Sequence, residues 1–351
     1  MNTIIKKILE IAVQAPSGEN AQPWKFSITN NQIYVFNIPE RDQSLYNFQQ
    51  RASFVAHGTL IENISIAASY LGYQIQIRLF PEIRDTNLVA VISLIKSQGE
   101  DPLFPYIPTR STNRKPYKTQ PLTHDQKNEI LKTADELGKG KIMLTEDRKK
   151  IVALAHVGSM NERVVFENPY LHAFLFTHIN WTEQEEKVKR LGFYIKTLEL
   201  PFLAQIGFRL FRYWSLVSIL NHLGLSKAIW KQNAKVYSSC AAIGVIVTPQ
   251  NTPEDFVYAG RIMQRSWLKA TKMGLSIQPM TGVLFFMQRI SEGKTQEFSS
   301  EQIQLIRNSY NTIKEAFGIT NGTIAMMFRI GYSDKPTAHS LKLSPIIIET
   351  D

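Results

Sequence analysis

The sequence predicts a large α+β protein in which a mixed sheet is flanked by helices. Helical and β-type periodicities alternate along the chain, but they do not form the regular series of a doubly wound parallel sheet. A hydrophobic content of 44% with 20% charged residues, over 351 residues, is typical of a folded chain with a sizeable core. No glycine-rich phosphate-binding loop follows any expected strand, which argues against a Rossmann or P-loop protein.

The first hundred residues are expected to form a helix, a hairpin, a second helix and a second pair of strands. Pro16 ends the first helical pattern because proline cannot continue the hydrogen-bond ladder, and Asn30-Asn31 form a hairpin-like turn. Gly72 closes the second helix as a C-terminal cap. The expected elements are a helix over 4–13, strands over 25–29 and 33–37, a helix over 54–71, and strands over 73–80 and 88–95.

A polar, proline-spaced linker at 97–108 separates this unit from the rest of the chain. We therefore expect two units, 1–100 and 101–351, the second with a helical insertion at about 165–235. The further elements expected are helices over 123–137 and 147–163, strands over 141–145 and 241–248, helices over 254–273 and 300–317, and a strand over 323–332.

The net charge of +10 is concentrated in one segment. Residues 187–235 contain nine basic residues and one acidic residue, so they contribute eight of the ten net positive charges. The rest of the chain is nearly neutral, which argues against general nucleic-acid binding. For the aromatic stretch 199–225 the sequence favours a lid or dimer-filling helix, with a membrane-surface helix as the alternative, because the stretch is too short and too charged to span a bilayer.

The sequence predicts no disulfide, no metal site and no targeting signal. The single cysteine, Cys240, excludes an internal disulfide and lies among small apolar residues typical of a buried strand. No histidine pair has the i, i+4 spacing of a metal site, so we expect no metal. No targeting signal is visible in the first twenty residues, and the cytoplasm is the expected location.

The loop at 15–24 combines small residues and two side-chain amides directly after a helix. Asn20 and Gln22 can each donate and accept hydrogen bonds, as reading the mixed edge of a planar ring requires. Gly18 allows a close backbone approach to a ligand. An ordinary helix-to-strand connection is the alternative for this loop. The candidate binding residues are Pro16, Ser17, Gly18, Asn20 and Gln22.

A second cluster lies at 110–117, where Arg110 and Arg114 stand four residues apart with the hydroxyls of Ser111 and Thr112 between them. One guanidinium can grip a phosphate while the other meets an anionic ring edge. A basic linker in solvent is the alternative for this cluster taken alone.

Together these motifs resemble the signatures of FMN-dependent nitroreductases. The loop at 15–24 is similar to the family's P-S-x-x-N-x-Q-P-W pattern, and 110–117 is similar to its R-R-S-x-R-x-F signature, with Ser111 in place of the second arginine. Residues 256–275 resemble its central helix, and 330–332 resemble its terminal G-Y-P, with serine where proline is usual. The resemblance also covers the loop that approaches flavin N5, at Pro279, Met280, Thr281 and Gly282, and a pyrimidine-edge asparagine, at Asn233.

The order of the motifs implies the tandem, single-chain branch of that family. A family monomer carries the arginine signature before the loop, and its flavin lies between two subunits; here the loop comes first and is not repeated in the second unit. The resemblance therefore implies an internal pseudo-dimer, in which 1–100 faces 101–351 with one complete FMN site and one lost. It covers most of the chain except 165–235.

The resemblance also implies roles for the residues. Arg114 would stabilise the negative charge of reduced flavin at N1 and O2. Arg110, Thr112 and Lys342 would hold the phosphate, although the family usually has two basic residues near the position of Lys342. The amides of 15–24 would reach the ring from the other half, and 280–282 would leave N5 open. No catalytic acid, base or nucleophile is expected, because the flavin moves the electrons.

The implied function is NAD(P)H-dependent two-electron reduction of nitroaromatics, quinones or a related small-molecule acceptor. The alternative is a protein that stores or sequesters FMN with little turnover. A third class, a membrane-associated or protein-binding module, rests only on the basic segment. A monomer containing the internal pseudo-dimer and a homodimer both fit.

Overall fold

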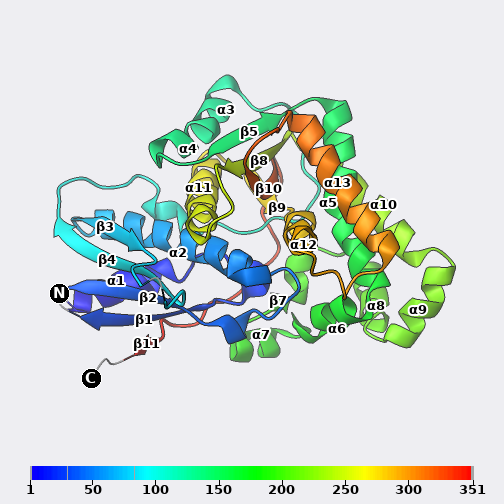
Figure 1. Cartoon of the computed structure of the whole chain (residues 1–351), viewed down its shortest axis with the longest axis horizontal. Helices are drawn as coiled ribbons and strands as arrows, with labels where there is room; N and C mark the ends of the chain where they lie inside the picture. Colours follow the sequence, from blue (N-terminus) through cyan, green and yellow to red (C-terminus); the bar gives the residue numbers. More distant parts are fainter. Residues whose placement is uncertain (1, 30, 83, 349–351) are drawn as a thin grey trace.

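The computed structural model describes residues 2–29, 31–82 and 84–348, and it confirms the α+β class, with two main sheets flanked by helices (Figure 1). The linker at 97–108 runs between the parts that carry the two sheets. Asn30 of the expected hairpin turn falls outside the described residues.

The first sheet is built by the first hundred residues and completed by the C-terminal segment. Its strand order is β11-β1-β2-β4-β3, and it is mixed because β1 pairs with β11 in parallel and the other neighbours are antiparallel. Helix α2 is buried along most of its length, as its lack of a polar face requires. The elements are α1 (Asn2–Ala12), β1 (Trp24–Thr29), β2 (Gln32–Asn37), α2 (Arg51–Tyr70), β3 (Tyr73–Leu79), β4 (Leu88–Lys96) and β11 (Ile347–Ile348), with short 3-10 helices at Gly18–Asn20, Pro39–Arg41, Phe48–Gln50 and Phe104–Tyr106.

The second sheet has the order β5-β8-β10-β9, and all its neighbouring strands are antiparallel. Long helical segments separate its strands along the chain, one between β5 and β8 and one between β9 and β10. The elements are α3 (His124–Leu131), α4 (Thr133–Glu136), β5 (Lys141–Thr145), α5 (Arg148–Glu167), β8 (Ala242–Thr248), α11 (Pro253–Lys272), β9 (Ser276–Pro279), α12 (Gly282–Ser291), α13 (Ser300–Phe317) and β10 (Thr323–Gly331).

The expected helical insertion contains five helices and a small parallel sheet of β6 and β7 (Figure 1). Helices α8 and α9 lie at the side of the molecule away from the first sheet. The elements are α6 (Pro169–Thr177), β6 (Ile179–Asn180), α7 (Glu183–Lys189), β7 (Phe193–Tyr194), the 3-10 helix Ile195–Leu198, α8 (Phe202–Leu210), α9 (Trp214–His222) and α10 (Leu225–Ser238). None of the described helices is long and apolar enough to cross a membrane.

The two sheets share one arrangement, because β1-β2-β4-β3 and β5-β8-β10-β9 follow the same order in space and in sequence. Helix α2 follows β2 as α11 follows β8, and both helices have 20 residues. Gly58 and Gly260 are each the eighth residue of their helix, and there the two helices cross. A Cβ on Gly58 would lie 2.0 Å from Val257 O, and a Cβ on Gly260 would lie 2.0 Å from Val55 O. The contact is therefore reciprocal and requires glycine on both sides.

The C-terminal segment joins the two parts. After β10 the chain crosses to the outer edge of the first sheet, where Phe26 N donates to Ile346 O at 2.8 Å and Phe26 pairs with Ile347. Sequence periodicity misses this strand, because its two residues carry no pattern. The helix expected over 123–137 is also divided into α3 and α4, where Thr133 Oγ1 donates to Glu129 O and competes with the helical ladder.

Candidate functional site

The predicted phosphate residues Arg110 and Lys342 come together in a group that we call the cationic cluster, with His339 beside them. Arg110 is 8% exposed, and its guanidinium carbon lies 4.5 Å from the centroid of the Trp267 ring. Its Nη2 donates to Gln14 O at 3.4 Å, while its Nε has no partner among the described residues. Burial lowers the pKa of Arg110 to about 10.

Lys342 lies near Arg110, and no carboxylate forms an ion pair with it among the described residues. Its Nζ donates to Asn20 Oδ1 at 2.7 Å. Burial and the charge of Arg110 lower the pKa of Lys342 to about 7, with Glu186 acting in the opposite direction. Burial of the ring and the charge of Arg110 also lower the pKa of the His339 imidazole, with Glu199 acting in the opposite direction, although His339 as a whole residue is exposed. Within the described ranges neither Arg110 nor Lys342 has an ion-pair partner. Because Glu186 offsets the charge of Lys342 only in part and no ion pair neutralises Arg110, the cluster favours an anionic ligand.

The loop at 15–24 has a strained backbone where it meets this cluster. Glu19, Asn20 and Gln22 have φ of 51°, 56° and 49°, in the left-handed region that non-glycine residues rarely adopt. Ser17 Oγ accepts a hydrogen bond from Gln22 N at 2.9 Å, and Pro16 O accepts one from a threonine hydroxyl of α2. Gly18 is exposed, and a Cβ there would meet nothing closer than 3.9 Å. No other part of the described protein therefore packs closely against the backbone of Gly18.

The amides of Asn20 and Gln22 differ from expectation, because both bond to the protein's own backbone. Asn20 Nδ2 donates to Arg190 O at 3.1 Å and to Leu341 O at 3.0 Å. Gln22 Nε2 donates to Arg190 O at 2.7 Å, and Gln22 Oε1 accepts from Leu343 N at 2.9 Å. Both side chains are buried, and buried amides need such partners. In this conformation the two amides tie the loop to the insertion and to the C-terminal segment.

The predicted loop Pro279, Met280, Thr281 and Gly282 lies in a second group, which we call the tyrosine–glutamate cluster and which contains Tyr46, Asn161, Glu162 and Tyr237. A Cβ on Gly282 would lie 2.1 Å from Asn161 Oδ1, and Met280 Sδ lies 3.0 Å from a Cβ built on Gly158. Tyr46 OH donates to Asn161 Oδ1 at 2.9 Å. The cluster therefore joins the first hundred residues to α5.

Glu162 is the titratable centre of this cluster. Tyr237 OH donates to Glu162 Oε1 at 2.7 Å, while the buried Glu162 Oε2 has no partner in the described part of the chain. Burial raises the pKa of Glu162 to about 7, although the Tyr237 bond and the charge of Arg114 lower it. Such a carboxyl group holds a proton at neutral pH for part of the time.

Arg114 belongs to this second group, and Arg110 belongs to the first. The segment between them is extended, since Thr112 forms a parallel bridge with Ile277 of β9. Arg114 Nη1 donates to Thr197 O at 3.0 Å, and its guanidinium carbon lies 5.5 Å from the Phe193 ring centroid. Burial lowers the pKa of Arg114, while Tyr237 and Glu162 favour its charged form.

The other predicted residues flank these groups. Ser111 and Thr112 lie on the extended segment between the two arginines, and both are partly buried. Asn233 is partly buried on α10, one helical turn before Tyr237. Sequence reasoning missed the side chains that come from distant elements, because no spacing relates them to either motif: Trp267, His339, Tyr46, Asn161, Glu162 and Tyr237.

The segment that covers the site is 179–198, which supplies Arg190 O, Phe193 and Thr197 O. Of the stretch expected to form a lid, 199–225, Glu199 reaches the cationic cluster, where its charge acts on His339. The aromatic side chains of the stretch pack elsewhere. The Phe211 ring lies 5.9 Å from Phe166, and Trp214 lies 5.1 Å from His172. These contacts anchor α8 and α9 on α5 and α6. The segment that covers the site is therefore 179–198 and not the aromatic part of 199–225.

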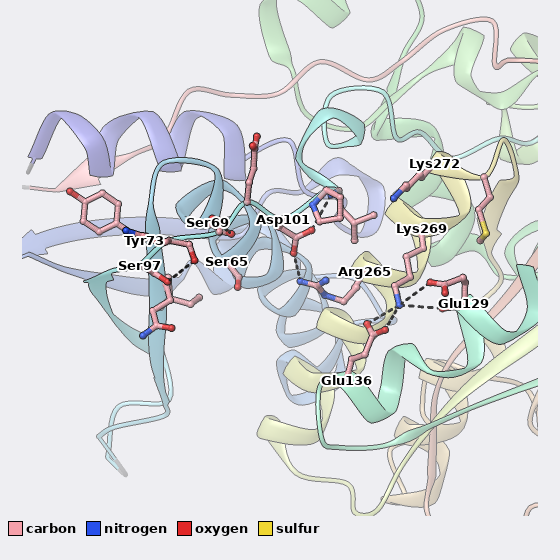
Figure 2. Close-up of a pocket in the computed structure, with 18 residues that line it drawn as sticks. Ser65, Ser69, Tyr73, Ser97, Asp101, Glu129, Glu136, Arg265, Lys269 and Lys272 are labelled. Atoms are coloured by element: carbon pink, nitrogen blue, oxygen red, sulfur yellow. Dashed lines mark hydrogen bonds and ion pairs between the residues drawn. The ribbon is translucent and has the colours of Figure 1, made fainter. Parts of the chain in front are cut away.

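A cleft of about 720 Å³ lies away from both clusters, between α2, β3, α11 and the α3–α4 region (Figure 2). Two of its three cations are neutralised, since Arg265 pairs with Asp101 at 2.7 Å and Lys269 pairs with Glu136 at 2.6 Å. The third, Lys272, is exposed and has no ion pair among the described residues. Ser65, which lines the cleft, is the fifteenth residue of α2, as Trp267 is the fifteenth of α11. The cleft thus lies beside the same position of α2 at which α11 contacts the cationic cluster. Among the described residues there is no group of metal-ligating side chains.

Comparison with known proteins gives distant similarities. No family model matches the chain. Over 283 residues it is 23% identical to an uncharacterised protein of Mycobacterium tuberculosis, covering 80% of this chain and 39% of that protein. Over 155 residues it is 26% identical to a putative NAD(P)H nitroreductase of the same species, covering 42% of this chain and 44% of that protein. The chain thus spans less than half the length of each of these relatives.

Solved structures of low similarity include three proteins named for flavin chemistry. A nitroreductase with bound FMN from Bacteroides fragilis has 8% identity and a TM-score of 0.36, covering 69% of this chain and 94% of that chain. NADPH:FMN oxidoreductase from Vibrio harveyi, complexed with NAD+, has 14% identity and a TM-score of 0.35, covering 70% and 73%. The FMN-dependent nitroreductase NfnB from Mycobacterium smegmatis, in complex with NADPH, has 13% identity and a TM-score of 0.36, covering 65% and 86%. TM-scores this low do not define a shared fold.

Proposed function

We propose that this chain is an FMN-binding oxidoreductase of the nitroreductase type. The observation that carries the proposal is the cationic cluster, where Arg110, Lys342 and His339 meet without an ion-pair partner for Arg110 or Lys342 in the described residues. A phosphate monoester supplies the missing negative charge and several acceptor oxygens, including one for the orphaned Arg110 Nε. The phosphate of FMN is therefore assigned to this cluster.

Arg114 is assigned to the ring end of the same ligand. Since the extended segment separates Arg110 from Arg114, the two side chains can hold opposite ends of one elongated molecule. FMN supplies two-electron hydride transfer when bound. A guanidinium at 4 Å from the anionic edge of the reduced ring contributes about 4 kcal/mol of attraction at an effective dielectric near 20, before desolvation. Arg114 thus favours the reduced state.

The tyrosine–glutamate cluster is assigned to the acceptor side. Nitroaromatics and quinones take up protons when they are reduced by two electrons. Glu162 can hold a proton near neutral pH, and Tyr237 fixes the orientation of its carboxyl group. NAD(P)H is the proposed electron donor.

We further infer an internal pseudo-dimer of 1–100 and 101–351, supported by the shared strand order and the reciprocal Gly58–Gly260 contact. The site draws on both halves. Asn20 from the first half meets Lys342 from the second, and Tyr46 from the first meets Asn161 from the second.

The test is anaerobic reduction of the FMN-loaded full chain by NADPH, followed by addition of a quinone. The proposal predicts bleaching of the flavin band and its rapid return when the quinone is added. A protein that binds FMN tightly but is not reduced by NADH or NADPH would contradict the enzyme assignment.

The alternative function, FMN storage, is favoured by one observation. The cover at 179–198 is tied down by Asn20, Gln22 and Arg114 through the backbone of Arg190 and Thr197. A cover held by three side chains restricts access of a nicotinamide. Storage predicts bound FMN that is reduced by light and a sacrificial donor but not by NAD(P)H.

A further inference from the structure

Helices α8 and α9 carry large apolar side chains that no described part of the chain covers. Among the described residues, half of the exposed large hydrophobic side chains lie within 202–223. Such a concentration on a surface marks an interaction site. The side chains and their exposed fractions are Phe202 74%, Leu203 79%, Ile206 50%, Leu210 53%, Tyr213 50%, Ile219 64% and Leu223 82%.

Only one side of α8 exposes apolar side chains to solvent. Phe208 is partly buried, and its ring lies 4.9 Å from that of Phe176. Phe202, Ile206 and Leu210 are spaced by four residues, so they form one stripe on the outer side. The inner side anchors the helix and the outer side is free to bind.

The segment of the chain that carries this face is basic. Between Leu200 and Gln250 the chain has no acidic residue. The five basic residues there are exposed and make no ion pair among the described residues: Arg209, Arg212, Lys227, Lys231 and Lys235. Elsewhere buried cations such as Lys269 are paired with carboxylates. The basic residues of this segment therefore keep positive charges that no ion pair neutralises among the described residues.

We propose that α8 and α9 dock on an anionic lipid surface, with the apolar stripe inserted at the headgroup boundary and the basic residues facing the headgroups. An exposed apolar stripe flanked by lysine and arginine is what an interfacial helix requires. Each helix has nine residues, which suits a position in the interface rather than across the bilayer. A second copy of the chain is disfavoured, because a symmetric contact would bring Arg209 and Arg212 of the two copies together while neither α8 nor α9 carries an acidic residue to pair with them.

The test is flotation of the purified full chain with vesicles of phosphatidylcholine alone and of equal parts phosphatidylcholine and phosphatidylglycerol. We expect binding to the anionic vesicles only, weakening as salt is raised. Arg209→Gln with Arg212→Gln should reduce the partition coefficient about thirtyfold, taking roughly 1 kcal/mol per basic residue. Phe202→Ser with Leu203→Ser should reduce it at least about tenfold.

Matched control variants remove basic or apolar side chains that are exposed elsewhere on the protein, away from α8 and α9. Lys6→Gln with Lys7→Gln on α1, and Val152→Ser on α5, should leave partition unchanged, and thermal melting confirms that each variant folds. Equal binding to both vesicle types would overturn the charge argument. Absence of vesicle binding, together with a dimer that Phe202→Ser and Leu203→Ser dissociate, would assign the face to a second copy and overturn the proposal.

Discussion

At the scale of single residues, the account depends on charges that the fold leaves uncompensated. Arg110 stacks on Trp267 and keeps an unpartnered Nε, while Lys342 is held by an amide rather than by a carboxylate. Arg265, on the same helix as Trp267, has two carboxylate partners instead. Arg265 therefore stabilises the fold through its ion pairs, whereas Arg110 and Lys342 are the cations to which we assign the phosphate.

Arg110→Ala should weaken FMN binding by about 1.5 to 3 kcal/mol, because a charge-assisted hydrogen bond to phosphate is lost. Arg114→Ala should instead lower the flavin midpoint potential, since the cation near the reduced ring is removed. Fluorescence titration and potentiometry measure the two quantities. Arg307→Ala, on the exposed side of α13, is the control. Identical effects of the two substitutions on both quantities would refute this division of roles.

Glu162 predicts a pH dependence of stability. Its pKa is raised from 4.5 to about 7 in the folded protein, so the folded state binds the proton more tightly than the unfolded state. This contribution is complete below pH of about 4.5 and is lost as pH rises to about 7, amounting to at most roughly 3 kcal/mol. Urea unfolding of the wild type and Glu162→Gln between these pH values measures it. A difference between them that does not change with pH would show that Glu162 titrates normally.

At the scale of elements, two parts of the architecture have distinct tasks. Helices α2 and α11 join the halves, and the segment 179–198 covers the clusters. The anchoring contact is local, since Gly58 and Gly260 alone permit the close crossing. The cover is attached by side chains of the loop and by Arg114, so it can be loosened without damage to the core.

Gly58→Ala should destabilise the protein by several kcal/mol, because its Cβ would lie 2.0 Å from Val257 O and the helices must separate. Gly207→Ala on α8 is the matched control, since a Cβ there meets nothing within 4 Å and alanine favours a helix. Urea unfolding measures both. If Gly58→Ala were as stable as Gly207→Ala, the crossing would not hold the halves together.

Phe193→Ala should speed reduction of the flavin by NADPH, because it removes the ring that lies against Arg114 and loosens the cover. Phe211→Ala with Trp214→Ala should leave the rate unchanged, since those rings pack on α5 and α6. Stopped-flow absorbance measures both rates on protein shown to be folded. If only the variant with Phe211→Ala and Trp214→Ala were reduced faster, the lid would be formed by 199–225 and not by 179–198.

The same elements show how far the sequence could predict the structure. Apolar periodicity located α5, α11, α13 and most strands of the two sheets closely, but it gave no strand at β9 or β11. The separate roles of Arg110 and Arg114 stay a prediction. Periodicity could not reveal that Tyr46 meets Asn161, since the two are 115 residues apart and meet only when the halves pack. It could not place the cover either, because Arg190 and Thr197 act through backbone carbonyls, which no side-chain pattern records.

At the scale of the whole molecule, two similar sheets surround non-equivalent sites. The cleft in Figure 2 lies against Ser65 of α2, at the position that Trp267 occupies on α11 beside Arg110. In the cleft Arg265 and Lys269 are paired with Asp101, Glu129 and Glu136, and only the exposed Lys272 has no ion pair among the described residues, whereas Arg110 and Lys342 are both without one. The two halves therefore predict one flavin site, built at their contact, rather than two.

The stoichiometry of FMN in the purified full chain tests this account most directly. The protein is saturated with FMN and freed of excess by gel filtration, and the flavin absorbance is compared with the protein concentration from amino-acid analysis. We predict a yellow protein with one FMN per chain, and loss of the colour in Arg110→Ala with Lys342→Met. Two FMN per chain, or a folded protein that takes up none, would contradict a single flavin site between the two halves.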